Sequence, residues 1–373
     1  MRKTSWILAA LTACGLLHGA ALAQEAKPMP APAAAPVMTA PVIIGGGCCD
    51  SGCCDTCCSR GGPIFDIGFM ILTPKWKDDP AIFFGDQTNT PETFRQQDFS
   101  FHNQFVPQIA LGYMGQGGLG VRIGWWGFAV GARESATLTN ETGNTTFYAA
   151  SPLQIQELSG QRVGMRNADK TLFTEAHLRM DVWDFEAVQS LGSGVWSGLL
   201  SGGIRYAHVS QTYNALTVFP DSTLNAAILS GHNFNGAGPT LSLEARRGIG
   251  ETGLYLYGKT RGSLLFGTAK QAGSIISFNT DNAAGDLLDA STRSNSFVPE
   301  GELELGIGFQ RQIRRGGLMF LQVGVVAQAW GNIGNASESA GSPDETFNNE
   351  QSSINRESTL GLIGVTAKAG LNW

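Results

Sequence analysis

The stretch QFVPQIALGYMGQGGLGVRIGWW, residues 104–126, decides the fold of this chain. On both sides of its GQGG turn, apolar residues alternate with mainly small or polar ones, which is the period-two pattern of a half-buried β-strand. One face is apolar and consists of Phe105, Pro107, Ile109, Leu111, Tyr113, Leu119, Val121, Ile123 and Trp125. The other face carries Gln104, Gln108 and Arg122 among small residues. The stretch therefore predicts a β-hairpin with one apolar face.

The same alternation recurs along the rest of the chain. It predicts ten strands, at 64–73, 104–114, 119–126, 172–183, 198–207, 236–246, 254–266, 297–311, 318–331 and 359–373. Strands of soluble sandwiches average about 5–6 residues, whereas a tilted strand needs about 9–11 residues to cross a membrane. Most of the predicted strands are long enough to cross a membrane. The expected fold class is therefore an all-β, antiparallel transmembrane barrel and not a secreted β-sandwich.

The predicted connections alternate sharply in length. Short turns that contain glycine are expected at 115–118, 187–194, 247–253 and 312–317, and long polar loops at 74–103, 132–170, 212–233, 267–296 and 332–358. Short periplasmic turns and long extracellular loops are typical of outer-membrane barrels. Ten strands also return both chain ends to the periplasm. If residues 81–86 and 98–103 form a further hairpin, the number of strands becomes twelve.

The composition agrees with an exported β-protein. Only 15% of the 373 residues are charged, against roughly 25% in average domains. Glycine accounts for 49 of the 373 residues, which is nearly twice its usual share of roughly 7%. The mean hydropathy of −0.03 is too low for a bundle of membrane helices. The net charge of −6 becomes −6 − 2 = −8 when the two bases within residues 1–23 are removed. An acidic chain without a basic patch is not expected to bind nucleic acid.

The first 23 residues have the features of a cleaved secretory signal peptide. Arg2 and Lys3 precede an apolar run, and an Ala-Leu-Ala sequence at 21–23 provides the cleavage site. As an alternative, the four residues that end at Cys14 resemble a lipobox, which would make Cys14 a lipidated N-terminus.

Two low-complexity segments separate this signal from the barrel, which is expected at 61–373. Residues 24–47 are rich in Pro and Ala and predict a flexible, extended spacer. Residues 48–60 follow, with three cysteine pairs: Cys48, Cys49, Cys53, Cys54, Cys57 and Cys58. In an oxidising compartment we expect disulfides between different pairs, between two copies of the chain or to other envelope proteins. A thiolate metal site with the spacing Cys54-x-x-Cys57 and a passive segment remain alternatives.

The face opposite the apolar one carries the charged residues, which are expected to line the lumen. These predicted pore-lining residues are Arg122, Glu175, His177, Arg179, Asp181, Arg205, Glu244, Arg246, Lys259, Arg261, Glu300, Glu302, Glu304 and Lys368. Three glutamates at every second position repel one another unless cations lie opposite them, so ion pairs are expected there. The lumen is therefore either a narrow water-filled pore with a transverse field or a salt-bridged interior that nearly closes the barrel.

Enzymatic activity is not expected, although His177 lies beside Glu175 and Asp181 in the pattern of a general base. A hydrogen-bonded histidine in the lumen is the simpler interpretation, because the sequence contains no serine-hydrolase, zinc-protease or phosphate-loop motif. No cofactor and no resident metal are expected.

The last predicted strand ends at Trp373, on the same face as Ile363 and Val365. A terminal aromatic residue on the lipid-facing side resembles the insertion signal of outer-membrane barrels. It predicts recognition by the barrel-assembly machinery and a final location in outer-membrane lipid.

Three segments, LFTEAHLRMDVWDFEAVQ (172–189), GLLSGGIRYAHVSQTY (198–213) and NFNGAGPTLSLEARR (233–247), resemble the β-barrel porins of planctomycetes. Those porins are similar to the major outer-membrane, pore-forming protein of legionellae. The resemblance covers roughly residues 64–373 and implies a passive pore or a structural barrel. It assigns no catalytic or ligand-binding role to particular residues of this sequence. Three functions follow as hypotheses: a porin-like channel, a barrel that anchors the envelope through its cysteines, and an adhesin that uses the long loops.

Overall fold

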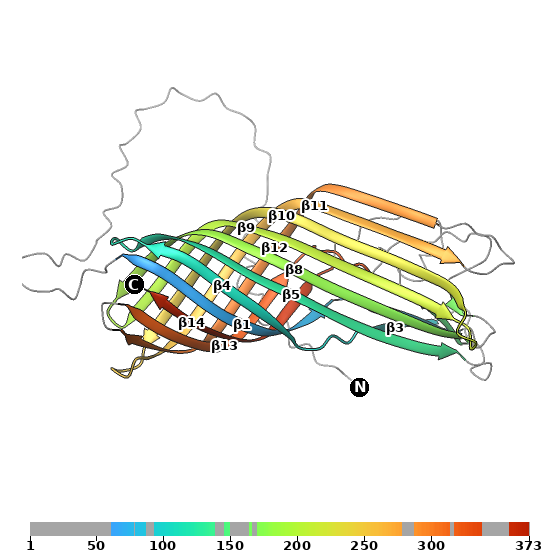
Figure 1. The fold of residues 1–373 in the computed structure, drawn as a ribbon, viewed down its shortest axis with the longest axis horizontal. Helices are drawn as coiled ribbons and strands as arrows, with labels where there is room; N and C mark the ends of the chain where they lie inside the picture. Colours follow the sequence, from blue (N-terminus) through green and yellow to red (C-terminus); the bar gives the residue numbers. More distant parts are fainter. Residues whose placement is uncertain are drawn as a thin grey trace, which may run out of the picture. The chain divides into compact units, whose positions relative to one another are not determined.

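Ten antiparallel strands close into a barrel in the computed structural model (Figure 1), in the order β1-β14-β13-β12-β11-β10-β9-β8-β5-β4. The structure describes residues 61–77, 79–86, 93–138, 145–149, 164–165, 170–277, 287–313, 317–337 and 358–372. The barrel strands are β1 (Gly62–Trp76), β4 (Gln104–Met114), β5 (Leu119–Leu138), β8 (Lys170–Ser193), β9 (Trp196–Val218), β10 (Leu224–Gly248), β11 (Leu254–Ser277), β12 (Leu287–Gln312), β13 (Leu318–Trp330) and β14 (Leu360–Asn372). The predicted all-β barrel is confirmed. No helix in the described part is long and apolar enough to cross a membrane.

Four shorter strands form a second sheet in the order β3-β2-β6-β7. They are β2 (Pro80–Asp86), β3 (Thr93–Asp98), β6 (Thr145–Ala149) and β7 (Gly164–Met165). The segment 81–86 is thus a strand, but it pairs with β3 and β6 and not with the barrel. The described barrel therefore has ten strands, and the alternative of twelve is wrong.

Strand length differs strongly around the barrel. Strands β8 to β12 contain 23 to 26 residues, whereas β4, β13 and β14 contain 11 to 13. The long strands continue past the short ones on one side of the barrel, toward the right in Figure 1. Much of the predicted loops 212–233 and 267–296 and of the predicted turn 187–194 is therefore strand. We call this side the long-loop end and the opposite side the short-turn end.

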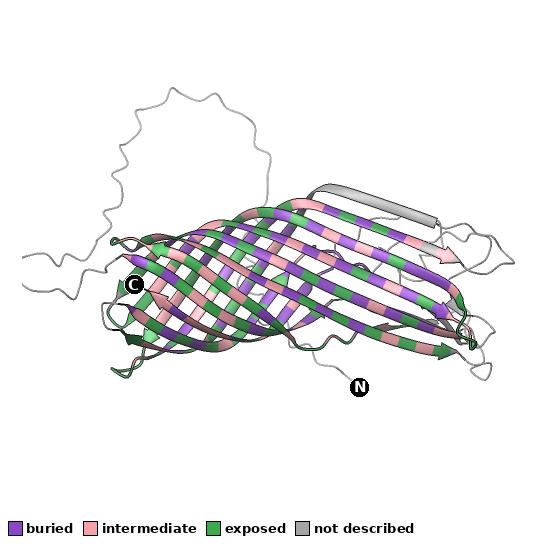
Figure 2. Ribbon diagram, viewed as in Figure 1, coloured by how far each residue is buried: buried purple, intermediate pink, exposed green. Residues whose placement is uncertain are grey.

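A belt of exposed apolar side chains surrounds the barrel near the short-turn end. Figure 2 shows the alternation of exposed and buried residues along the strands. On the long-loop side, a row of aromatic residues bounds the belt: Phe69, Phe105, Trp125, Trp183, Tyr206, Phe266 and Phe297. Such a girdle marks the interface of a membrane. In β8 the belt extends from Trp183 to Leu191, which fits the span of about 9–11 residues that a membrane requires.

Beyond the girdle, the two faces of the strands exchange their polarity. The inner face becomes apolar and forms a core that includes Phe128, Leu178, Met180, Val182, Val209, Phe234, Leu265, Val298 and Trp330. A second cluster beside it packs Ala81 and Ile82 of β2 against Leu172 and Tyr213 of the barrel. The core of the molecule is therefore inside the barrel, at the girdle and on its long-loop side.

Close approach of the backbones makes Gly203 a sensitive position. A Cβ atom at Gly203 would collide with the carbonyl oxygen of Phe185 on β8, whereas a Cβ at Gly262 would meet no atom within 4 Å. We expect Gly203→Ala to lower the free energy of unfolding by about 1–3 kcal/mol because the strands must separate. Urea unfolding in detergent micelles, followed by tryptophan fluorescence, measures this effect. Gly262→Ala is the matched control, and an equal loss in both variants would contradict the prediction.

Candidate functional site

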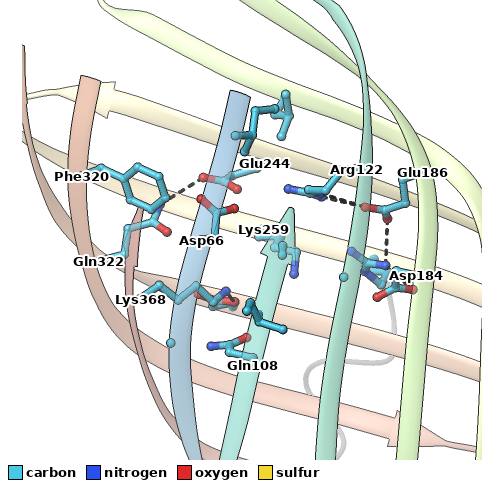
Figure 3. A pocket seen from close by; sticks show the side chains of 18 of the residues that line it. Asp66, Gln108, Arg122, Asp184, Glu186, Glu244, Lys259, Phe320, Gln322 and Lys368 are labelled. Carbon is cyan, nitrogen blue, oxygen red and sulfur yellow. Dashed lines mark hydrogen bonds and ion pairs between the residues drawn. The ribbon is translucent and has the colours of Figure 1, made fainter. Parts of the chain in front are cut away.

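Among the described residues, thirteen charged side chains lie in the interior of the barrel inside the apolar belt. This charged cluster consists of Asp66, Arg122, Asp184, Glu186, Arg205, Glu244, Arg246, Lys259, Arg261, Glu300, Glu302, Glu304 and Lys368. They come from eight of the ten barrel strands. Where one strand contributes several of them, they are two residues apart, because every second residue of a strand faces inward. Figure 3 shows Asp66, Arg122, Glu244 and Lys368 pointing into the same space.

Arg205 of β9 is at the centre of the cluster and is only 1% exposed. Its Nε and Nη2 donate to the two carboxylate oxygens of Asp184 on β8, at 2.8 and 2.9 Å. Its Nη1 forms an ion pair with Glu300 of β12 at 2.9 Å. Because β9 and β12 are not adjacent, this arginine connects two separate parts of the wall.

Arg261 of β11 makes a second connection across the interior. Its Nη1 lies 2.9 Å from Asp184 and 2.8 Å from Glu186, both on β8. Glu186 also accepts from Arg122 of β5 at 2.8 Å. Two carboxylates thus share three guanidinium groups, which offsets much of the cost of removing these charges from water.

Each of the three glutamates on β12 has a cation as its partner. Glu300 pairs with Arg205, Glu302 with Lys259 at 2.6 Å, and Glu304 with Lys368 at 2.6 Å. The expected ion pairs are therefore present. Only Lys259 comes from the neighbouring strand β11, whereas the other two cations reach β12 from β9 and β14.

A cavity of about 370 Å³ lies within the charged cluster. It extends from Met70 and Trp126 near the girdle to Met114, Ser190 and Asn372 at the short-turn end. Most of the cluster lines it, together with Gln108 and Gln322. The part of the barrel that crosses the apolar belt therefore encloses a polar space and not a dry core.

An apolar layer closes the interior on the long-loop side of this cavity. Trp126 of β5 and Trp330 of β13 meet edge to face, with ring centroids 6.2 Å apart. Three strands, β4, β1 and β14, separate β5 from β13 around the barrel, so the two rings extend toward each other from distant parts of the wall. Trp330 has no exposed surface, and the core residues of the inner face surround the pair. The lumen is thus closed in this conformation.

Four predicted pore-lining residues lie on the outer face of the barrel, so their predicted inward orientation is wrong. Glu175 pairs with Arg133 at 2.6 Å and with His177 at 3.0 Å, and Arg179 pairs with Asp181 at 3.0 Å. The side chain of Arg179 is 69% exposed. These residues lie beyond the girdle, where the outer face of β8 contacts water and its inner face contacts the apolar core. The other ten predicted residues have their side chains inside the barrel.

Sequence reasoning missed three members of the charged cluster: Asp66, Asp184 and Glu186. The signal for the last two was present, because Trp183, Asp184, Phe185 and Glu186 alternate aromatic and acidic residues within the belt. The predicted strand ended at residue 183 and so excluded them. Several other predictions lie outside the described residues: the signal peptide with Cys14, the spacer, the six paired cysteines and Trp373.

Comparison with known proteins identifies one family. The family model of the Legionella pneumophila major outer membrane protein precursor matches residues 62–372, from the start of β1 to the end of β14. No curated protein matches the chain. Among solved structures, the outer membrane protease OmpT from Escherichia coli is similar at 10% identity and a TM-score of 0.42, covering 83% of this chain and 96% of that one. The toluene transporters TodX from P. putida and TbuX from Ralstonia pickettii are 8% identical, with TM-scores of 0.22 and 0.23, and each match covers 84% of this chain and 90% of the transporter.

Proposed function

Because the chain belongs to the family of the Legionella pneumophila major outer membrane protein, we propose that it is a porin-like barrel that admits small hydrophilic solutes or ions. The observation that carries this proposal is the polar cavity of about 370 Å³ inside the apolar belt. In this arrangement the short turns face the periplasm and the long loops face the exterior, as in other outer-membrane barrels.

The charged cluster limits the proposed channel to small solutes. Arg205 and Arg261 extend across the interior and hold carboxylates of β8 and β12. A ten-stranded barrel is only slightly wider than the eight-stranded kind that side chains fill completely. Water and small ions fit beside such side chains, whereas a large solute requires the ion pairs to separate. The conformation described here is the closed state of the proposed channel, because Trp126 and Trp330 meet above the cavity.

A structural barrel is the second candidate function. The contact between the two tryptophans and the ion pairs across the interior favour it, because both connect distant parts of the wall and fill the lumen. A structural barrel needs no open state. The two candidates therefore differ in one measurable property, which is conductance.

Planar-bilayer recording of the refolded protein distinguishes them. We expect brief steps of small conductance, well below those of open barrels with sixteen strands, because the cluster narrows the lumen. Detergent without protein is the blank, and heat-denatured protein controls for nonspecific leakage. If the wild type and a variant without the tryptophan contact both give no steps, the channel is wrong and the structural barrel is favoured.

A further inference from the structure

The chain folds back into the barrel directly after Trp330. Residues Gly331–Ser337, here called the strap, follow the last residue of β13, and Ile333, Asn335, Ala336 and Ser337 are all buried. Ala336 belongs to the second apolar cluster, beside Tyr213 and Ile228 of the barrel wall. The strap therefore occupies the interior at the long-loop end, in direct continuity with one of the two tryptophans that close the lumen.

Polar side chains of β9 and β10 hold the strap backbone. Gln211 donates from Nε2 to the carbonyl oxygen of Gly334 at 3.1 Å, and its Oε1 accepts from the amide of Ala336 at 3.2 Å. Ser230 donates to the carbonyl oxygen of Ala336 at 2.9 Å. These bonds satisfy backbone groups that would otherwise be buried without partners.

The side chains of the strap meet a single carboxyl group, that of Asp79. Asn335 donates to Asp79 Oδ1 at 3.1 Å, and Ser337 donates to the same oxygen at 3.3 Å. Asp79 lies between β1 and β2 and is only 6% exposed. Its Oδ2 is buried and has no hydrogen-bond partner among the described residues. The site therefore fits a neutral carboxyl group better than a carboxylate.

The charged groups near Asp79 do not stabilise its ionised form. Asp98 of β3 lies near it with a like charge, whereas the imidazole of His177 lies on the outer face of β8, where it pairs with Glu175. Lys77 is two residues away on the same segment, and no ion pair joins it to Asp79 in the structure described. Burial, with a smaller contribution from Asp98, raises the pKa of Asp79 to about 7 against the hydrogen bonds from Asn335 and Ser337.

We propose that Asp79 and the strap form a latch that keeps Trp330 against Trp126 while Asp79 is protonated and releases them when Asp79 ionises. This inference rests on the proposed channel function, because it assigns a control element to the same lumen. Protonated Asp79 accepts from Asn335 and Ser337 and carries no charge. Ionised Asp79 leaves a charged oxygen buried without a partner, which favours hydration of the site and withdrawal of the strap.

The direction of the pH effect follows from the two states of the latch. When the strap withdraws, Asp79 meets water and its pKa returns toward 3.8, its ordinary value. Below about pH 4 both states are protonated, and the latch has its full strength. Between about pH 4 and pH 7 only the released state loses its proton, so the latch weakens as the pH rises. Above about pH 7 both states are ionised, and no further change is expected.

Hydrogen exchange of the strap in Asp79→Asn tests the latch without reference to conductance. The asparagine keeps the acceptor oxygen and replaces the unpartnered oxygen with an uncharged amide. At pH 8 we expect the strap amides of the wild type to exchange at least about tenfold faster than those of Asp79→Asn, and at about pH 3.5, where Asp79 is protonated in both states of the latch, within about twofold. Asp221→Asn is the matched control, because Asp221 is exposed in the turn between β9 and β10 and should leave exchange unchanged. Equal exchange of wild type and Asp79→Asn at pH 8 overturns the latch.

Bilayer recording of the same variants then connects the latch to the lumen. The wild type should open more often at pH 8 than at pH 5, whereas Asp79→Asn should open rarely at both. If channels form but Asp79→Asn keeps the pH dependence of the wild type, the latch is wrong and the channel stands. If exchange responds as expected and no variant conducts at either pH, the strap is a folding contact, so both the proposed function and its control of the lumen fail.

Discussion

Replacing Arg205 with methionine is expected to lower the free energy of unfolding of the barrel by about 3–5 kcal/mol. Methionine fills much of the same volume but cannot donate to Asp184 or Glu300, both of which are buried. Asp184 keeps Arg261 as a partner, whereas Glu300 loses its only ion pair among the described residues. Removing one partner of a buried ion pair destabilises a protein much more than removing both partners, because it leaves one buried charge unpaired. Most of the loss should therefore come from Glu300.

Urea unfolding of the refolded protein, followed by tryptophan fluorescence and by gel mobility without heating, measures this loss. Arg179→Met is the matched control because it removes an ion pair that is mostly exposed, for which less than about 1 kcal/mol is expected. Adding Glu300→Gln to Arg205→Met should recover part of the stability, because the unpaired charge is removed. Equal losses in Arg205→Met and Arg179→Met would show that the charged cluster does not hold the wall together.

The membrane-spanning part of the fold was predictable because one physical rule applies along its whole length. Lipid surrounds the outer face and polar groups fill the inner face, so each strand alternates with a constant phase. The segment 236–246 illustrates this, since Glu244 faces inward while Leu241 and Leu243 are exposed on the outer face. Reading the period was sufficient to orient ten of the fourteen predicted side chains.

Beyond the girdle the same rule fails because the solvent changes along the strand. In β8, the apolar residues Leu178, Met180 and Val182 face inward, and Arg179 and Asp181 face water. The alternation is unbroken across Trp183, so period alone does not show that the polarity has reversed. The aromatic row that marks this boundary is formed by several strands, and it becomes recognisable only once their register is known.

The closure of the lumen was not predictable for a different reason. The inward orientation of Trp126 follows from its position in the alternation, but its contact with Trp330 depends on barrel closure. The segment 332–358 was predicted as a loop from its polar composition. Residues 333–337 of this segment are buried, and Gln211, Ser230 and Asp79 supply partners for their polar groups. Such partners are far away in sequence, so composition alone indicates an exposed loop.

Removing the tryptophan contact is expected to produce the largest change in conductance. In the double variant Trp126→Ala and Trp330→Ala, two large rings that meet above the cavity are replaced by methyl groups. A narrow apolar constriction excludes water and ions, and widening it allows hydration. We therefore expect the time-averaged conductance at pH 5 to rise at least about tenfold above that of the wild type. The higher conductance should be nearly independent of pH, because the latch then has no closed contact to hold.

The double variant must be shown to fold, because each buried tryptophan contributes about 3–5 kcal/mol relative to alanine. Gel mobility without heating and a cooperative urea transition establish this, and Trp330→Ala alone is the milder variant if the double one does not refold. Trp196→Ala is the matched control, since Trp196 lies at the start of β9 with 52% of its surface exposed and contacts Arg247 instead of the lumen. A folded double variant that conducts no better than Trp196→Ala would mean that the two rings do not close a channel. The charged cavity would then be the interior of a structural barrel, in which Arg205 and Arg261 serve only to hold the wall together.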